Sequence, residues 1–165
     1  KLAGTSMDAD AAAKMDQWDD EIAAAAKATG LPANYIKATM YAESRGNPGT
    51  DSVNPDGEHH DVGLMQISNY TYDYVRSKQP GAPEITDISD PAQNIMAGAW
   101  ELKDKFETAG GSFPIAGNVD SILAKTSAMY VGHGDSTDAA YADAVLQMKA
   151  DLDNNAGLKD EYGNF

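Results

Sequence analysis

Met40-Tyr41-Ala42-Glu43-Ser44 ends a segment, beginning at Ala33, in which apolar residues cover more than one face of a predicted helix. Such a helix is buried on several sides. Near its end, burial and the negative end of the helix dipole both raise the pKa of a carboxyl such as Glu43. A carboxyl that stays protonated near neutral pH can give a proton to a leaving oxygen atom. From position alone, the commoner explanation of Glu43 is an exposed side chain at a helix end.

Apolar periodicity predicts further helices on both sides of this stretch. Upstream, an alanine-rich helix is expected to end at Gly30. Downstream, the clearest helix begins at Asp90-Pro91, a capping acid followed by proline, and ends before Gly110-Gly111. Its apolar stripe consists of Ile95, Ala99, Leu102 and Phe106. The alanine-rich helix is expected over 8–29 and the helix that carries Glu43 over 33–44. Three more helices are expected over 69–78, 119–130 and 137–152, the last with Tyr141, Val145, Met148 and Leu152 facing inward.

Residues 45–67 are predicted to form a long irregular loop that contains at most a short β-like piece. Glycine, proline, asparagine and aspartate fill its first part. Loops of this length in a compact domain are usually functional or disordered. No other strand and no repeat is evident. The sequence therefore predicts one all-α domain over 1–165, with a core of about 8–152 and a polar tail at 153–165.

Composition excludes several classes of function. The 165 residues contain 12 basic and 26 acidic side chains, a net charge of −14, and no cysteine. Cysteine-ligated metal sites, thiol nucleophiles and disulfide scaffolds are therefore excluded. The acidic balance argues against nucleic acid as a partner. No apolar run is long enough to predict a membrane span. Eight of the aromatic residues are tyrosines, which combine a flat apolar face with a hydroxyl and suit a sugar-binding groove.

Four short motifs occur in a fixed order: Glu43-Ser44, Asn47-Pro48, Ser52 and Gly63-Leu64-Met65-Gln66-Ile67. Together they resemble the lytic transglycosylases of the goose-type lysozyme superfamily, the enzymes that cut peptidoglycan strands. The resemblance extends along most of the chain. It includes the segments 24–38, 90–102, 128–130 and 141–146. The implied fold is a compact, α-rich, lysozyme-like domain with a substrate groove between helices.

The resemblance also implies roles for individual residues. Glu43 is the general acid that protonates the glycosidic oxygen between N-acetylmuramic acid and N-acetylglucosamine, and then the base that accepts the proton of the 6-hydroxyl, which leaves a 1,6-anhydromuramic end. Ser52 contacts the muramoyl residue. The hydroxyl of Tyr130 lies near the catalytic carboxyl. Gly63, Leu64, Met65 and Gln66 line the groove, with Met65 and Gln66 facing the sugars. For Met65 alone, a core side chain that fills a gap is the simpler interpretation.

The chain departs from the family pattern in three places. Val131 replaces a common asparagine, and Thr137 replaces a common glutamate. The third departure is a longer loop between Ser52 and Gly63. That loop carries Asp56, Glu58, His59, His60 and Asp61.

Asp56 or Asp61 could serve as the second carboxylate of an inverting muramidase. The competing interpretation is that both are solvated loop charges. His59-His60 lacks a third ligand at a recognisable spacing, so no metal is expected. His133 is better explained as a turn residue than as a residue that binds substrate.

Three hypotheses about function remain open at this stage. The first is a lytic transglycosylase with Glu43 as acid and base. The second is a goose-type muramidase, and the third is a module that binds peptidoglycan without efficient cleavage. No cofactor is expected, and the expected partner is the peptidoglycan glycan strand. The acidic charge favours a domain delivered by a larger protein or assembly, such as a virion tail, a secreted wall hydrolase or a secretion apparatus. Its location would be extracellular, at the cell wall or in a phage virion.

Overall fold

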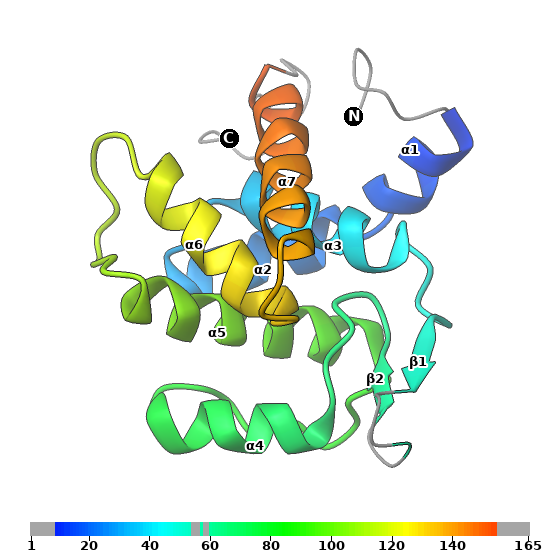
Figure 1. The fold of residues 1–165 in the computed structure, drawn as a ribbon. Helices are drawn as coiled ribbons and strands as arrows, with labels where there is room; N and C mark the ends of the chain where they lie inside the picture. The colour runs from blue at the N-terminus through cyan, green and yellow to red at the C-terminus, as the bar shows by residue number, and fades with distance from the viewer. Residues whose placement is uncertain (1–8, 54–56, 58–59, 155–165) are drawn as a thin grey trace.

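The structure, a computed structural model, describes residues 9–53, 57 and 60–154 (Figure 1). The described part of the chain is a bundle of helices with one small antiparallel hairpin, as the predicted all-α class requires. The helices are α1 (Ala9–Asp16), α2 (Asp19–Thr29), α3 (Ala33–Ser44), α4 (Asn69–Lys78), α5 (Pro91–Thr108), α6 (Asp120–Val131) and α7 (Thr137–Asp153). The strands are β1 (Asp51–Val53) and β2 (His60–Val62). None of the described helices is both long and apolar enough to cross a membrane.

Helix α5 lies at the centre of the arrangement (Figure 1). Helices α2 and α6 pack on one side of it and α4 on the other, while α7 packs on α3 and α6. The predicted apolar stripe of α5 is completely buried at Ile95, Ala99, Leu102 and Phe106. The side chain of Asp90 accepts a hydrogen bond from the Gln93 amide and caps this helix as predicted.

The helix expected over 8–29 is two helices, so that part of the prediction is wrong. Tertiary contacts explain the break between α1 and α2. Lys37 is buried on α3, and its ammonium contacts Asp16 at 2.7 Å and Asp19 at 2.6 Å. Trp18, between the two acids, donates from Nε1 to the Gly46 carbonyl at 3.1 Å. A buried ammonium must be paired, and the break places one acid from each helix beside it.

The loop 62–67 is fixed to α5 by one asparagine. Asn94 is completely buried. Its Nδ2 donates to the carbonyls of Val62 (2.9 Å) and Ile88 (2.7 Å), and its Oδ1 accepts from the Met65 amide at 2.7 Å. Gly63 has φ 77°, and a Cβ there would lie 2.6 Å from Asn94 Nδ2. The position therefore requires glycine.

Candidate active site

Glu43 lies in the last turn of α3 and is half-buried. The hydroxyl of Tyr141, from the first half of α7, donates a hydrogen bond to Glu43 Oε2. Burial raises the pKa of Glu43 to about 7, although the Tyr141 hydrogen bond lowers it and the negative charge of Asp61 raises it further. A carboxyl with this pKa is partly protonated at neutral pH and can act both as a proton donor and as a base.

A second buried carboxyl, Glu101 on α5, lies near the first. Glu101 is 7% exposed. Burial raises the pKa of Glu101 to about 8; Lys105 opposes the shift, while Asp61 and Glu43 add to it. Glu101 is not among the site residues predicted from the sequence. The available signal was an acidic residue set directly between Trp100 and Leu102 of a strongly apolar helix.

Two tyrosines lie near Glu43, and Tyr141 is the one that donates a hydrogen bond to it. Tyr130, near the end of α6, donates from its hydroxyl to the Met65 carbonyl at 2.6 Å instead. Burial, together with the nearby carboxyls of Glu101 and Glu43, raises the pKa of Tyr130 well above its ordinary value. Tyr130 therefore stays protonated and holds the loop 62–67 in place. Tyr141 was expected only as an inward-facing residue of the last helix.

The segment Gly63–Gln66 is a tight turn against α5. The side chains of Leu64 and Met65 are completely buried, and Met65 packs on Gly98, where a Cβ would lie 2.4 Å from the Met65 Cβ. The structure thus places Met65 in the core, as the simpler interpretation had it. Gln66 has φ 50°. Its side chain is half-buried and donates to the carbonyls of Thr50 and Gly63, each at 2.9 Å.

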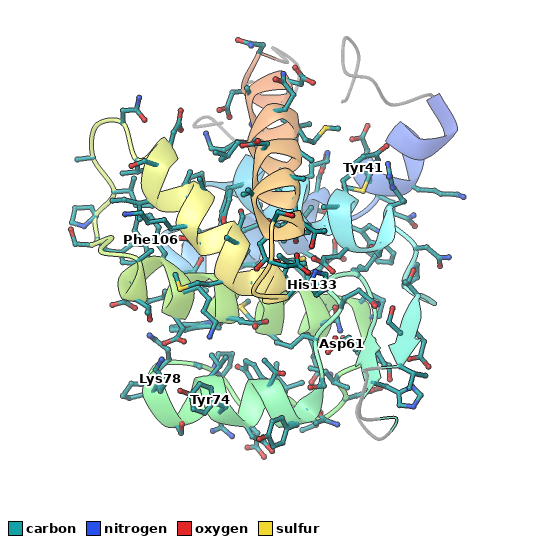
Figure 2. All side chains as sticks on the ribbon, viewed as in Figure 1. Tyr41, Asp61, Tyr74, Lys78, Phe106 and His133 are labelled. Atoms are coloured by element: carbon teal, nitrogen blue, oxygen red, sulfur yellow. The ribbon has the colours of Figure 1, made fainter. Side chains whose placement is uncertain are left out.

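The hairpin brings one of the candidate second carboxylates toward Glu43. Ser52 on β1 is exposed and pairs with Asp61 on β2. Asp61 is half-buried, and its charge acts on both Glu43 and Glu101. Figure 2 labels Asp61 on the hairpin. Asp56, Glu58 and His59 lie outside the described residues.

Neither described histidine singled out in the sequence analysis contacts Glu43. His60 Nδ1 lies 3.0 Å from Asp51 Oδ1 across the exposed hairpin. His133 stands with Asp135 and Asp138 at the start of α7, and one ligand atom from each lies within 4.8 Å of the others. Asp138 accepts hydrogen bonds from the amides of His133 (3.0 Å) and Gly134 (2.8 Å). These hydrogen bonds fix the turn that precedes α7.

Comparisons with known proteins identify the family of this chain. The family profile of the Transglycosylase SLT domain matches residues 20–149, from α2 into α7. A stretch of 87 residues is 32% identical to membrane-bound lytic murein transglycosylase E of Buchnera aphidicola subsp. Acyrthosiphon pisum (strain APS) and covers 51% of this chain. The match spans only 37% of that relative's length. The resemblance seen in the motifs is confirmed, and the chain belongs to the Transglycosylase SLT domain family.

Proposed function

We propose that this domain cleaves the glycan strands of peptidoglycan between N-acetylmuramic acid and N-acetylglucosamine, with Glu43 as general acid and base. The observation that carries the proposal is the half-buried Glu43 carboxyl, with a pKa of about 7 and a hydrogen bond from Tyr141, in a domain of this family. The name of the similar lytic murein transglycosylase supports the same substrate. We infer that the domain is extracellular, at the cell wall or in a phage virion, and that it is part of a larger protein or assembly.

Protonated Glu43 gives its proton to the glycosidic oxygen, and the bond from that oxygen to C1 breaks with oxocarbenium-like charge at C1. The carboxylate left behind keeps the hydrogen bond from Tyr141, which stabilises the negative charge. Glu43 then accepts the proton of the 6-hydroxyl while that oxygen bonds to C1. The product is a 1,6-anhydro end, and no water is consumed.

A hydrolase is the second candidate, because it needs a second carboxylate and the negative charge of Asp61 raises the pKa of Glu43. In that reaction a carboxylate deprotonates water on the opposite face of the sugar. Asp61 suits this role better than Glu101. Burial raises the pKa of Glu101 to about 8, so Glu101 is mostly protonated at neutral pH and is a poor base there.

The mass of the released fragments distinguishes the two reactions. We expect digestion of purified sacculi to give muropeptides of anhydro mass, because the 6-hydroxyl and not water attacks C1. Liquid chromatography with mass detection of unreduced digests checks this. Fragments heavier by one water molecule would contradict the transglycosylase and support the hydrolase. In that case Asp61→Asn should remove the activity, whereas under the transglycosylase mechanism it should retain cleavage.

The pH dependence of cleavage should report the ionisation of Glu43. We expect kcat/KM to fall as the pH rises through about 7, because the general acid loses its proton. Tyr141→Phe removes a hydrogen bond that lowers the pKa of Glu43, so the fall should move to higher pH by roughly one unit. Rates of fragment release from sacculi, measured from about pH 4 to about pH 9, test this shift.

Tyr72→Phe is the matched control for this pH shift. Tyr72 also donates its hydroxyl, to the Pro83 carbonyl at 2.6 Å, but it lies on α4 and makes no contact with Glu43. Its substitution should leave the position of the fall unchanged. If the fall stays at the wild-type pH in Tyr141→Phe as well, the hydrogen bond does not tune the acid.

A further inference from the structure

A groove of about 1040 Å³ lies beside the end of α2, between the α2–α3 turn and the loop that follows α5. It is lined by residues 23, 26–33, 103 and 113–115. Figure 2 labels Phe106, whose ring centre lies 5.3 Å from that of Phe113 in this loop, on the opposite side of the view from Asp61. We call this the α2 groove. None of the residues placed near Glu43 lines it, so the proposed reaction gives it no role.

The surface of the α2 groove is mostly apolar. Two small side chains of α2, Ala23 and Ala26, form one wall, and Phe113 and Ile115 form part of another. All four are half-buried. Ala26, Phe113 and Ile115 pack against the main core and still remain partly open to solvent. Covering such a surface with the apolar side chains of a partner is favourable, and exposed apolar surface gathered in one place is typical of an interaction site.

Close packing holds the walls of the α2 groove in place. Gly30 has φ 80°, and a Cβ there would lie 2.9 Å from Cδ1 of Phe113. The loop therefore lies directly against the α2–α3 turn. The ring of Phe113 also packs on Phe106, and its centre lies 4.1 Å from the ammonium of Lys103. Because these packed segments form the groove in advance, little conformational entropy is lost in its walls when a partner binds.

The charge of the α2 groove is opposite to that of the whole chain. Two lysines, Lys27 and Lys103, line it, and among the described residues no acidic side chain does. The chain as a whole contains 26 acidic and 12 basic residues, a net charge of −14. Two other cavities each have an aspartate in their walls, Asp138 in one and Asp151 in the other. The α2 groove is therefore a local basic site that attracts acidic groups.

Both lysines can pair with a carboxylate from outside the domain. Lys27 is exposed, and within the described part of the chain no ion pair to it is found. Lys103 pairs with Glu107, one turn further along α5, at 3.2 Å. The side chain of Glu107 is 42% exposed, and an exposed pair of this kind contributes little to stability. A second carboxylate can therefore bind the same ammonium group.

We propose that the α2 groove is a docking site for a peptide segment of a partner protein that combines apolar and acidic side chains. The apolar side chains pack on Ala26, Phe113 and Ile115, and the carboxylates pair with Lys27 and Lys103. Because the groove lies away from the hairpin, a docked segment leaves the candidate active site open. This inference goes beyond the proposed function and does not depend on it, since it concerns how the domain is held and not what it cuts.

Two short synthetic peptides test the charge complementarity. One has leucine at helical spacing and glutamate at the other positions, and the second has lysine in place of each glutamate. The net charge of −14 favours the basic peptide over most of the surface, so only a local site can prefer the acidic one. We expect the acidic peptide to bind the full chain about tenfold more tightly or better in isothermal titration calorimetry. Equal affinities, a preference for the basic peptide, or no binding of either would overturn the docking proposal.

Lys27→Glu is the variant for this test, and Lys125→Glu is its matched control. Both replace an exposed lysine and change the net charge equally, but Lys125 lies on α6 and does not line the α2 groove. We expect Lys27→Glu to weaken binding of the acidic peptide roughly fivefold or more, and Lys125→Glu to weaken it less than about twofold. An equal loss in both variants would mean general repulsion, and the docking site would be refuted. Coincident thermal unfolding curves for the two variants exclude a folding effect.

The place where the acidic peptide binds separates this inference from the proposed function. Amide signals in nuclear magnetic resonance spectra should shift mainly in residues 23–33 and 113–115, and equally in wild type and Glu43→Gln. Cleavage of sacculi by wild type should continue at the same rate with the peptide bound. Shifts centred on the hairpin, or inhibited cleavage, would place the peptide at the candidate active site and contradict the docking proposal. If wild type does not cut sacculi yet the peptide binds in the α2 groove, the docking site stands and the enzymatic proposal fails.

Discussion

Glu43→Gln is expected to lower the rate of glycan-strand cleavage by about 10³-fold while leaving the fold and the binding of sacculi unchanged. The amide has the size of the carboxyl and can still accept the hydrogen bond that Tyr141 donates to Oε2. It cannot give a proton to the glycosidic oxygen, and it cannot accept the proton of the 6-hydroxyl afterwards. Both steps of the proposed reaction are therefore lost together. Fragment release from sacculi gives the rate, and co-sedimentation with sacculi gives the binding.

Glu101→Gln distinguishes the role of Glu101 from that of Glu43 in this test. Because burial raises the pKa of Glu101 to about 8, that carboxyl is mostly neutral at pH 7, and its replacement by a neutral amide should cost about tenfold at most. Glu107→Gln, on the exposed side of α5, should have no effect. Should Glu101→Gln prove as inactive as Glu43→Gln, the assignment of a single general acid would be wrong. If wild type binds sacculi without ever cutting them, the chain is a binding module.

The elements predicted correctly are those whose signals are local in sequence. The start of α5 follows from a capping aspartate followed by proline, and its buried face follows from apolar residues at helical spacing. The end of α2 follows from Gly30, which adopts the left-handed conformation at φ 80°. Helix α3 was bounded correctly because Leu31-Pro32 and the run from Arg45 to Gly49 flank it.

What the sequence did not predict depends on contacts between distant segments. The break between α1 and α2 places Asp16 and Asp19 around Lys37, and no local pattern encodes that pairing. The same holds for the site. Glu43 was found from a motif, but Tyr141 reaches it only because α7 packs on α3. Glu101 was not predicted, because only the packing of α5 places it near Glu43.

Asn94→Ala is expected to lower the free energy of unfolding by about 3 kcal/mol or more. The side chain is completely buried and makes three hydrogen bonds to backbone groups: the carbonyls of Val62 and Ile88 and the amide of Met65. Alanine leaves the Met65 amide and the Ile88 carbonyl without this partner, whereas the Val62 carbonyl keeps the hydrogen bond from the Ile67 amide at 3.2 Å. Each unpaired buried group costs roughly 1–3 kcal/mol. Urea unfolding followed by circular dichroism measures the loss. Asn69→Ala, at an exposed position on α4, should change stability by less than about 0.5 kcal/mol.

Asn94→Asp shows whether the hydrogen bonds or the packing of Asn94 stabilises the fold, because aspartate has nearly the same shape as asparagine. An ionised carboxylate can accept from the Met65 amide but cannot donate to the carbonyls of Val62 and Ile88, and it is a buried charge without a counterion. Asn94→Asp should therefore destabilise at neutral pH at least as much as Asn94→Ala, and should recover as the pH falls and the carboxyl gains a proton that it can donate. Equal stability of Asn94→Asp and wild type at neutral pH would show that Asn94 only fills space. Tyr130 donates to the Met65 carbonyl in the same turn, so a substitution of Asn94 that destabilises this turn should also lower the cleavage rate. Asn69→Ala should cleave at the wild-type rate.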